Sequence, residues 1–268
     1  MTDSRSDRML TERRFDAQTT TALDAFVLSM ADDEFVIGFM DSEWTGIAPI
    51  LEEDVAMSSI SQDELGHARA LYELLAGLRA DRRDADAIAY DREPDEYRHA
   101  ALLDHARGDW ATTIARRVLY ESADAARLAS IGGGWAPLAE LVGKIRREER
   151  YHGMHAAIWA NRLASAGGDA RRRFVAALET LVPDAGSVLA PVQDESALLV
   201  AGILTRPVAD AAGAWRADVA ALLGPLGIHL EMPIASAPRP VAAPRSEAFR
   251  WLWGEFTSVR RSDPGAAW

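Results

Sequence analysis

Two segments of this sequence place a Glu-x-x-His motif inside an apolar stripe that has helical spacing. The motifs are Glu64 with His67, and Glu149 with His152. Residues three apart lie on one face of a helix, so the two side chains of each motif can reach a common point. An apolar stripe is the face that a helix buries, so we expect long helices that carry carboxylates and imidazoles on their buried faces. The apolar residues on the motif faces are Ile60, Leu71, Leu74 and Leu78 in the first segment, and Leu138, Leu141, Ile145, Ala156, Trp159 and Leu163 in the second.

Helical periodicity continues through most of the chain, whereas strand-like alternation is nearly absent. Glycine and proline residues predict where the helices end, because neither residue favours a helix interior. The predicted fold class is all-α, a four-helix bundle with additional C-terminal helices. The four main helices are predicted over residues 20–44, 53–80, 110–130 and 137–166. Further helices are predicted over residues 96–107, 169–181, 194–223 and 246–261, with a kink or a split at Pro207.

Composition divides the chain into three parts. Residues 1–19 lack the apolar centre of a secretory signal, so we expect a disordered leader. Residues 20–232 form the predicted helical domain. Residues 233–268 begin as a proline-rich linker and end in a helix dense in aromatic residues, which we expect to dock on the bundle or on another chain. The prolines are Pro233, Pro238, Pro240 and Pro244, and the aromatic residues are Phe249, Trp251, Trp253 and Phe256.

The absence of cysteine limits the chemistry that this chain can perform. It excludes disulfides, thiolate-bound zinc and any iron–sulfur cluster held by this chain, and it fits a cytoplasmic location. The formal net charge of -12 argues against nucleic-acid binding, because the phosphate backbone would repel an acidic surface. Two arginine clusters, at residues 79–83 and 171–173, are interpreted as solvated helix ends. The sequence also lacks the uninterrupted apolar run of about 18 residues that a membrane span needs.

Two further glutamates complete the pattern of a dinuclear metal site. Helix bundles that hold two metal ions take one glutamate from each of the other two helices. Glu34 and Glu121 fill these positions, since each lies on the apolar seam of its predicted helix. Glu34 precedes Glu64 by 30 residues and Glu121 precedes Glu149 by 28, so both pairs have nearly the same helix–turn–helix layout. The alternatives that stay open are Asp33 and Asp41 for Glu34, and Asp124 for Glu121.

The predicted metal ligands are Glu34, Glu64, His67, Glu121, Glu149 and His152. An oxygen-rich set with two imidazoles suits iron or manganese better than zinc or copper, which prefer more nitrogen or sulfur. A buried network of ion pairs without metal is the structural alternative. We favour metal because clusters of buried ionisable groups are commonly functional sites. The sequence offers no catalytic residue beyond these ligands and no flavin or nicotinamide fingerprint.

The two motif segments resemble a known protein family. Residues 62–69 read QDELGHAR and residues 148–152 read EERYH. Both are similar to the ferritin-like subunits of bacterial phenylacetyl-CoA epoxidase. In layout the chain is closest to the C-type subunit of that enzyme, and the resemblance covers residues 28–268. It is most specific in residues 43–44, 48–49, 51–56 and 109–116, and in the ending with Pro264, Gly265 and Trp268.

This sequence departs from the C-type pattern at the metal ligands. In that family the A-type subunit is the catalytic di-iron protein, whereas the C-type subunit is its structural partner and has lost metal ligands. Here Glu64, His67, Glu149 and His152 are all present. The chain is therefore similar to the C-type subunit in layout and to the A-type subunit in its ligands.

The resemblance implies a ferritin-like fold and a role in aromatic catabolism. The implied function is that of a component of a multi-subunit di-iron monooxygenase, which epoxidises the ring of a phenylacetyl-CoA-like thioester. The implied cofactors are two iron ions, with manganese as a possible substitute, dioxygen as co-substrate and an external reductase. The implied partners are the reductase and a sister ferritin-like subunit, or a second copy of this chain. Three other functions stay open: a stand-alone di-iron oxygenase with another substrate, a non-catalytic structural subunit, and an iron-handling or peroxide-reducing protein.

Overall fold

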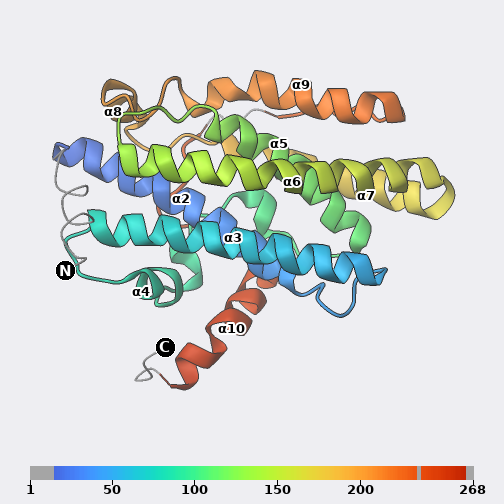
Figure 1. Ribbon diagram of the computed structural model, residues 1–268, viewed down its shortest axis with the longest axis horizontal. Coiled ribbons are helices and arrows are strands. Elements are labelled where there is room, and N and C mark those ends of the chain that lie inside the picture. The colour runs from blue at the N-terminus through green and yellow to red at the C-terminus, as the bar shows by residue number, and fades with distance from the viewer. Residues whose placement is uncertain (1–14, 234–236, 264–268) are drawn as a thin grey trace. The chain divides into compact units, whose positions relative to one another are not determined.

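The computed structural model describes residues 15–233 and 237–263 of the 268-residue chain. Within these ranges every regular element is a helix, and the β pairing is an isolated bridge between Ile131 and Leu204. The predicted all-α class is confirmed (Figure 1). The described helices include none that is both long and apolar enough to cross a membrane. The four main helices are α2 (Ala17–Ser42), α3 (Leu51–Leu78), α5 (Trp110–Leu128) and α6 (Ala136–Ala166), each close to its predicted range.

The chain divides into two compact units. Unit 1 consists of Met1–Phe26, Ala100–Leu102 and Gly108–Arg239. Unit 2 consists of Val27–His99, Leu103–Arg107 and Pro240–Trp268. Most of the predicted leader, residues 1–14, lies outside the described residues, and α2 already begins at Ala17, so residues 17–19 are helical.

Helix α5 forms the centre of unit 1. It packs against α6, α7 (Gly168–Ala185) and α9 (Ala212–Leu223), and nearly all of its residues are therefore buried. On α9, the buried Trp215 donates its indole N–H to the Leu119 carbonyl oxygen over 3.2 Å. The predicted helix over residues 194–223 is split near Pro207, because proline cannot donate a hydrogen bond inside a helix. It forms α8 (Glu195–Val200), the 3-10 turn Val208–Ala211 and α9.

The glycine run after α5 ends the helix and also forms hydrogen bonds with a second backbone segment. The amide N–H groups of Gly132 and Gly134 donate to the carbonyl oxygens of Ile203 and Gly202, over 2.7 and 2.8 Å. A Cβ atom on Gly134 would lie 2.3 Å from the Ala201 carbonyl oxygen. Only glycine allows so close an approach of two backbone segments, so this run fixes the entry into α6.

Unit 2 has a buried aromatic core. Phe35 of α2 contacts Tyr72 of α3, Tyr90 of α4 (Ala85–Tyr90) and Phe256 of α10 (Glu247–Ser262), with ring centroids 5.8, 5.3 and 4.9 Å away. The three rings meet Phe35 edge to face, which is a favoured geometry for aromatic pairs. Three successive helices and the distant α10 therefore share one core.

The predicted helix over residues 96–107 is wrong. The structure has only the 3-10 turns Pro94–Glu96 and Ala101–Asp104 in this region. Backbone groups here bond to distant side chains instead: the Arg98 amide donates to Asp32 over 2.6 Å, and Arg245 donates to the His99 carbonyl oxygen over 3.2 Å. A helix would need the same backbone groups for its own hydrogen bonds, so tertiary bonding replaces it.

Helix α4 lies in a segment for which no helix was predicted. Its N-terminus is capped by Asp84, whose carboxylate accepts from the Ala87 amide over 2.8 Å. With six residues, α4 is too short for a helical period to be recognised in the sequence.

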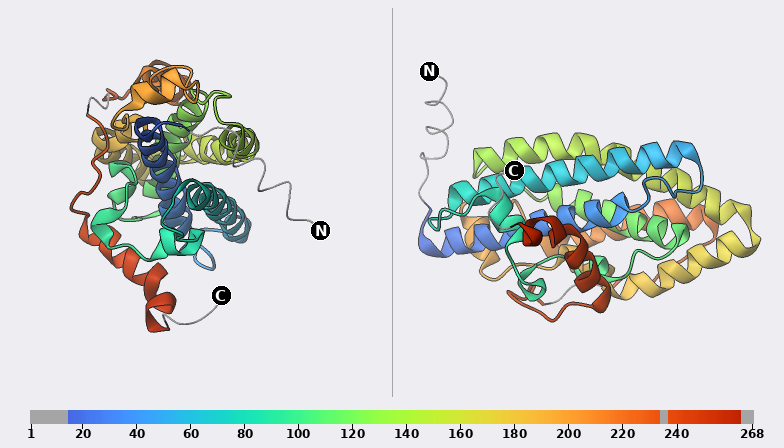
Figure 2. Two further views of the ribbon diagram at one scale, coloured as in Figure 1. Left: turned by 90° about the vertical axis from the view of Figure 1, so that its left-hand side faces the viewer. Right: turned by 90° about the horizontal axis from the view of Figure 1, so that it is seen from below.

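Helix α10 packs on its own unit. The views in Figure 2 show it beside the segment that follows α4. Ser246 caps its N-terminus, and Trp253 donates its indole N–H to the Arg92 carbonyl oxygen over 2.9 Å. Phe256 is only 8 % exposed, whereas Trp251 on the outer face is 58 % exposed. One face of the predicted docking helix therefore completes unit 2, and a docking role for the other face stays a prediction.

Candidate metal centre

Unit 2 contains a triad of predicted ligands, Glu34 from α2 with Glu64 and His67 from α3. All three side chains are buried. The Nδ1 atom of His67 lies 3.3 Å from Glu34 Oε2 and 3.9 Å from Glu64 Oε2. Each residue offers one ligand atom within 4.8 Å of those of the other two. The sequence spacing thus brought two carboxylates and one imidazole together across two helices.

A glycine allows α2 and α3 to approach closely beside this triad. A Cβ atom on Gly38 would lie 3.0 Å from the Cβ atom of Glu64 and 3.0 Å from Cγ of Leu65. Such distances are shorter than normal carbon–carbon contacts. Gly38 follows Glu34 by about one helical turn, so the close approach of the two helices lies one turn from the Glu34 side chain. This role of Gly38 could not be predicted from the sequence, because a lone glycine in a helix gives no sign of what packs against it.

A buried ion pair lies close to Glu34 along α2. The carboxylate of Asp32 accepts hydrogen bonds from Tyr72 over 2.6 Å and from Arg92 Nη1 over 2.9 Å. Burial alone would raise the pKa of Asp32, but attraction to Arg92 and hydrogen bonds from Arg92, Tyr72 and the Arg98 amide lower it overall. Asp32 is thus held as a carboxylate on the helix that carries Glu34. The sequence motifs gave no signal for this network.

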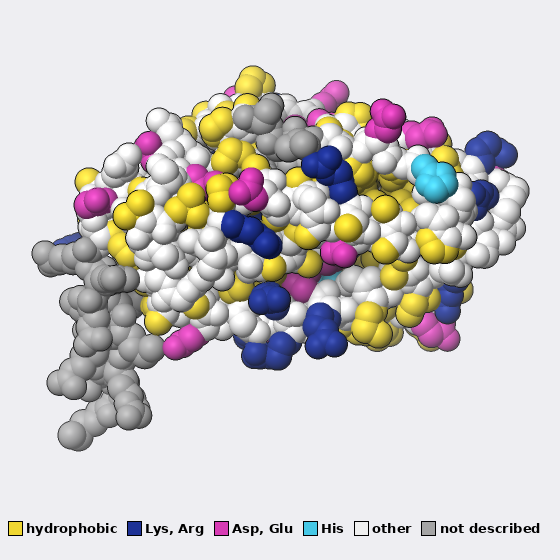
Figure 3. All heavy atoms as spheres, turned by 90° about the horizontal axis from the view of Figure 1, so that it is seen from above, with side chains coloured by type: hydrophobic (Ala, Val, Ile, Leu, Met, Phe, Trp, Pro, Cys, Tyr) yellow, Lys and Arg dark blue, Asp and Glu magenta, His cyan; other side chains and the backbone are white. Residues whose placement is uncertain are grey.

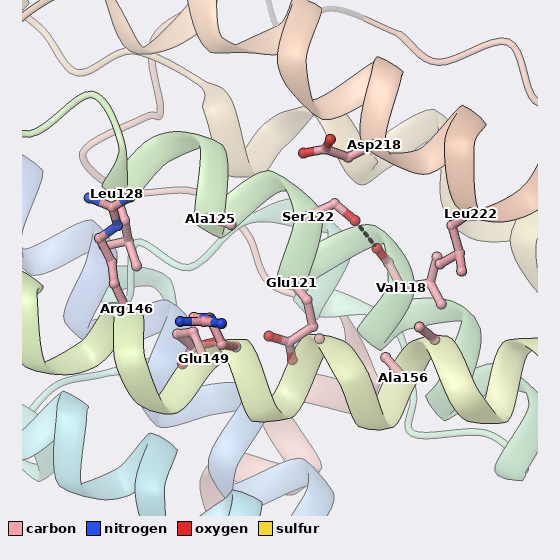
Figure 4. A pocket seen from close by; sticks show the side chains of 13 residues that line it. Val118, Glu121, Ser122, Ala125, Leu128, Arg146, Glu149, Ala156, Asp218 and Leu222 are labelled. Carbon is pink, nitrogen blue, oxygen red and sulfur yellow. Dashed lines mark hydrogen bonds between the residues drawn. The ribbon is translucent and has the colours of Figure 1, made fainter.

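Unit 1 contains the second triad, Glu121 from α5 with Glu149 and His152 from α6. These side chains are buried as well. The Nδ1 atom of His152 lies 3.3 Å from Glu149 Oε1, and the three residues offer ligand atoms within 4.8 Å of one another. Figure 4 shows the Glu121 and Glu149 side chains pointing toward each other from the two helices. The second triad has the same composition as the first.

The aspartates considered as alternatives have other surroundings. Asp124 forms a buried ion pair with Arg127, whose Nε lies 2.8 Å from Asp124 Oδ1. Asp33 and Asp41 are buried, but the clusters of ligand atoms found among the described residues include neither. Glu34 and Glu121 are therefore the better candidates.

One contact in unit 1 was not predicted. Arg117 Nη1 lies 2.6 Å from Glu121 Oε1, and both side chains are buried. Arg117 precedes Glu121 by one helical turn on α5, so the spacing is visible in the sequence. Many such pairs are solvated surface pairs, and only the burial of α5 on most sides shows that this one is not.

A pocket of about 380 Å³ opens onto the unit 1 triad between α5, α6 and α9. Glu121 and Glu149 lie in its lining, and Asp218 reaches it from α9 (Figure 4). The space exists because α6 contributes small residues, among them Gly153. In Figure 3, basic side chains gather near a hollow that exposes carboxylate atoms. The remaining lining residues are Val118, Ser122, Ala125, Leu128, Arg146, Arg150, Ala156, Ala157 and Leu222.

Comparison with known proteins identifies the family. A family model described as "Phenylacetic acid catabolic protein" matches residues 8–268. The chain belongs to this family. It is also 27 % identical over 247 residues to the C-type subunit of 1,2-phenylacetyl-CoA epoxidase from Escherichia coli (strain K12). That match covers 92 % of this chain and 99 % of the relative. The resemblance stated from the motif segments is thereby confirmed, whereas the assignment of the six metal ligands stays a prediction.

Proposed function

We propose that this chain is a metal-holding component of a multi-subunit di-iron monooxygenase, which epoxidises the ring of a phenylacetyl-CoA-like thioester. The observation that carries the proposal is the pair of buried triads, each with two glutamates and one histidine. Membership of a phenylacetic acid catabolic family and similarity to an epoxidase subunit support the substrate class.

The residues of the triads fit a pair of iron ions. Each triad offers two carboxylates and one imidazole, a donor set that suits iron(II) or manganese(II). Burying several carboxylates is costly unless a cation balances them, and two divalent ions would match the charge of the four triad glutamates. In the proposed centre, Glu34, Glu64 and His67 hold one ion, and Glu121, Glu149 and His152 hold the other. The near-equal 30- and 28-residue intervals support two ion-binding triads of equivalent layout.

Bound iron would supply the activation of dioxygen, and the residues of this chain would control access and position. The exposed surface of the pocket beside Glu121 and Glu149 is mainly apolar, and charged side chains also lie in its lining, so it suits a ligand that combines an apolar ring with polar groups. The sequence has no flavin or nicotinamide fingerprint and no cysteine, so the electrons would come from a separate reductase. A sister ferritin-like subunit would be the other partner.

A non-catalytic structural subunit is the second candidate function. The observation that favours it is the ion pair between Arg117 and Glu121, because a guanidinium already balances one carboxylate of the unit 1 triad. In this function the triads would help to fix the helices, and chemistry would take place in a partner chain.

Metal analysis of the purified full chain from iron-supplied cells separates the two candidates. We expect about two irons per chain, as in bundles with this ligand pattern. Replacing Glu64 and Glu149 by alanine should abolish iron binding while helix content is retained. The control is Glu73→Ala with Glu148→Ala, which removes the more exposed glutamates of the same two helices and should leave the iron content unchanged. Wild-type protein with almost no iron would favour the structural function instead.

A further inference from the structure

We propose that Arg117 competes with metal for Glu121 and so lowers the metal affinity of the unit 1 triad. This inference rests on the proposed function, because it concerns metal binding at that triad. Arg117 Nη1 lies 2.6 Å from Glu121 Oε1. While Arg117 donates to this oxygen, its positive charge weakens the attraction of Glu121 for a metal ion, and its N–H occupies one of the lone pairs that a bidentate ligand would offer.

The strength of the competition follows from burial and charge. The Arg117 side chain is 1 % exposed and that of Glu121 is 5 % exposed, so salt and water screen the pair poorly. An arginine stays protonated at all physiological pH values, which makes the competing charge permanent. Charge-assisted hydrogen bonds of this kind are among the strongest in proteins. A metal ion must therefore share or displace a strong partner of Glu121.

The same helix contains a pair that serves as a reference. Arg127 and Asp124 are also buried on α5 and also form an ion pair one turn apart. Asp124 does not belong to either cluster of ligand atoms, whereas Glu121 offers an atom within 4.8 Å of those of Glu149 and His152. The two pairs are alike in chemistry and burial, and they differ in whether the acid belongs to a triad.

Arg117 is also expected to stabilise the metal-free chain. A buried carboxylate without a cation destabilises a fold, and Arg117 supplies that cation when metal is absent. The side chain thus stabilises the metal-free chain and weakens metal binding through one contact. Removing the charge should shift both quantities, in opposite directions.

Titration of the metal-stripped full chain with manganese(II), which is stable in air, tests this inference. Arg117→Gln removes the charge and keeps an N–H donor for Glu121. To isolate the unit 1 triad, the titration is repeated with Glu34→Gln and His67→Gln also present. We expect Arg117→Gln to tighten manganese binding at least about tenfold in both backgrounds, given the strength of a buried charge-assisted bond. Arg127→Gln, the matched control, should change the affinity by less than about twofold, because Arg127 forms its ion pair with Asp124, which belongs to neither cluster of ligand atoms.

The outcomes separate this inference from the proposed function. Equal manganese affinity in wild type and Arg117→Gln overturns the role of Arg117, while measurable binding by both keeps the proposed metal site. Absence of manganese binding in every variant overturns both. If Arg117→Gln does not fold, Arg117→Met replaces it, because methionine removes the charge and still fills the buried space with a long, flexible side chain. That variant should bind manganese more tightly than wild type, and unchanged binding would overturn the inference.

Discussion

The Nδ1 atom of His67 lies 3.3 Å from Oε2 of Glu34, and this contact joins α3 to α2 in the interior of unit 2. The two residues are 33 positions apart in the sequence, so their contact depends on how the two helices pack. That packing and the pocket in unit 1 lead to testable predictions.

The approach of α2 to α3 at Gly38 should be sensitive to a single methyl group. Gly38→Ala places a Cβ atom 3.0 Å from the side chains of Glu64 and Leu65, so we expect a loss of about 1–3 kcal/mol in the free energy of unfolding. Manganese affinity should fall as well. The control is Gly66→Ala on exposed helix surface, where nothing lies within 4 Å and alanine should stabilise by about 0.5–1 kcal/mol. Urea denaturation of the two variants measures the changes in the free energy of unfolding. Equal changes in Gly38→Ala and Gly66→Ala would contradict the packing role of Gly38.

The pocket in unit 1 should depend on Gly153. Its missing side chain leaves open space, so Gly153→Leu should fill the pocket without disturbing the backbone. We expect the iron content to stay unchanged and the turnover of phenylacetyl-CoA by the reconstituted complex to fall at least about tenfold, as expected when substrate is misplaced. Gly143→Leu is the control, because Gly143 lies on the same helix with open space and outside the pocket lining. Full turnover by the Gly153 variant would show that substrate does not use this pocket.

The buried His99 should make stability depend on pH. Burial lowers the pKa of His99, although a hydrogen bond with Asp104 acts in the opposite direction and Arg245 adds to the lowering. A histidine with a lowered folded-state pKa stabilises the fold above its unfolded pKa of about 6.5. This contribution is lost as the pH falls through the folded-state pKa. Denaturation at pH 7.5 and 5.5 should therefore show a smaller pH dependence for His99→Asn than for wild type, and an identical dependence would contradict the assignment.

The two faces of α10 should respond differently to truncation. Phe256→Ala removes a ring from the aromatic core of unit 2 and should lower the free energy of unfolding by about 3–5 kcal/mol. Trp251→Ala changes the exposed face and should alter stability by less than about 0.5 kcal/mol. If α10 also docks on a sister subunit, Trp251→Ala should weaken that association in sedimentation experiments. Unchanged association would restrict α10 to its role within the chain.

The helices and the ligand candidates could be predicted from the sequence because both follow a period. Glu64 and His67 interrupt an apolar stripe of α3, and a stripe of that length has few alternatives to a buried helix. Features that depend on a distant partner could not be predicted. The Asp32–Arg92 pair spans 60 positions, and the segment around Arg98 gives up helical hydrogen bonds for tertiary ones. Arg117 and Glu121 have an ordinary helical spacing, which in most proteins indicates a solvated surface pair. The burial of α5, which the sequence does not show, makes this pair relevant to metal binding.

The central claim is that the two triads hold metal, and anomalous diffraction at the iron edge tests it most directly. Crystals of the iron-loaded full chain should show two anomalous peaks. One should be coordinated by Glu34, Glu64 and His67, and the other by Glu121, Glu149 and His152. Fully iron-loaded crystals without an anomalous peak at either triad, or with peaks only at surface carboxylates, would contradict the account.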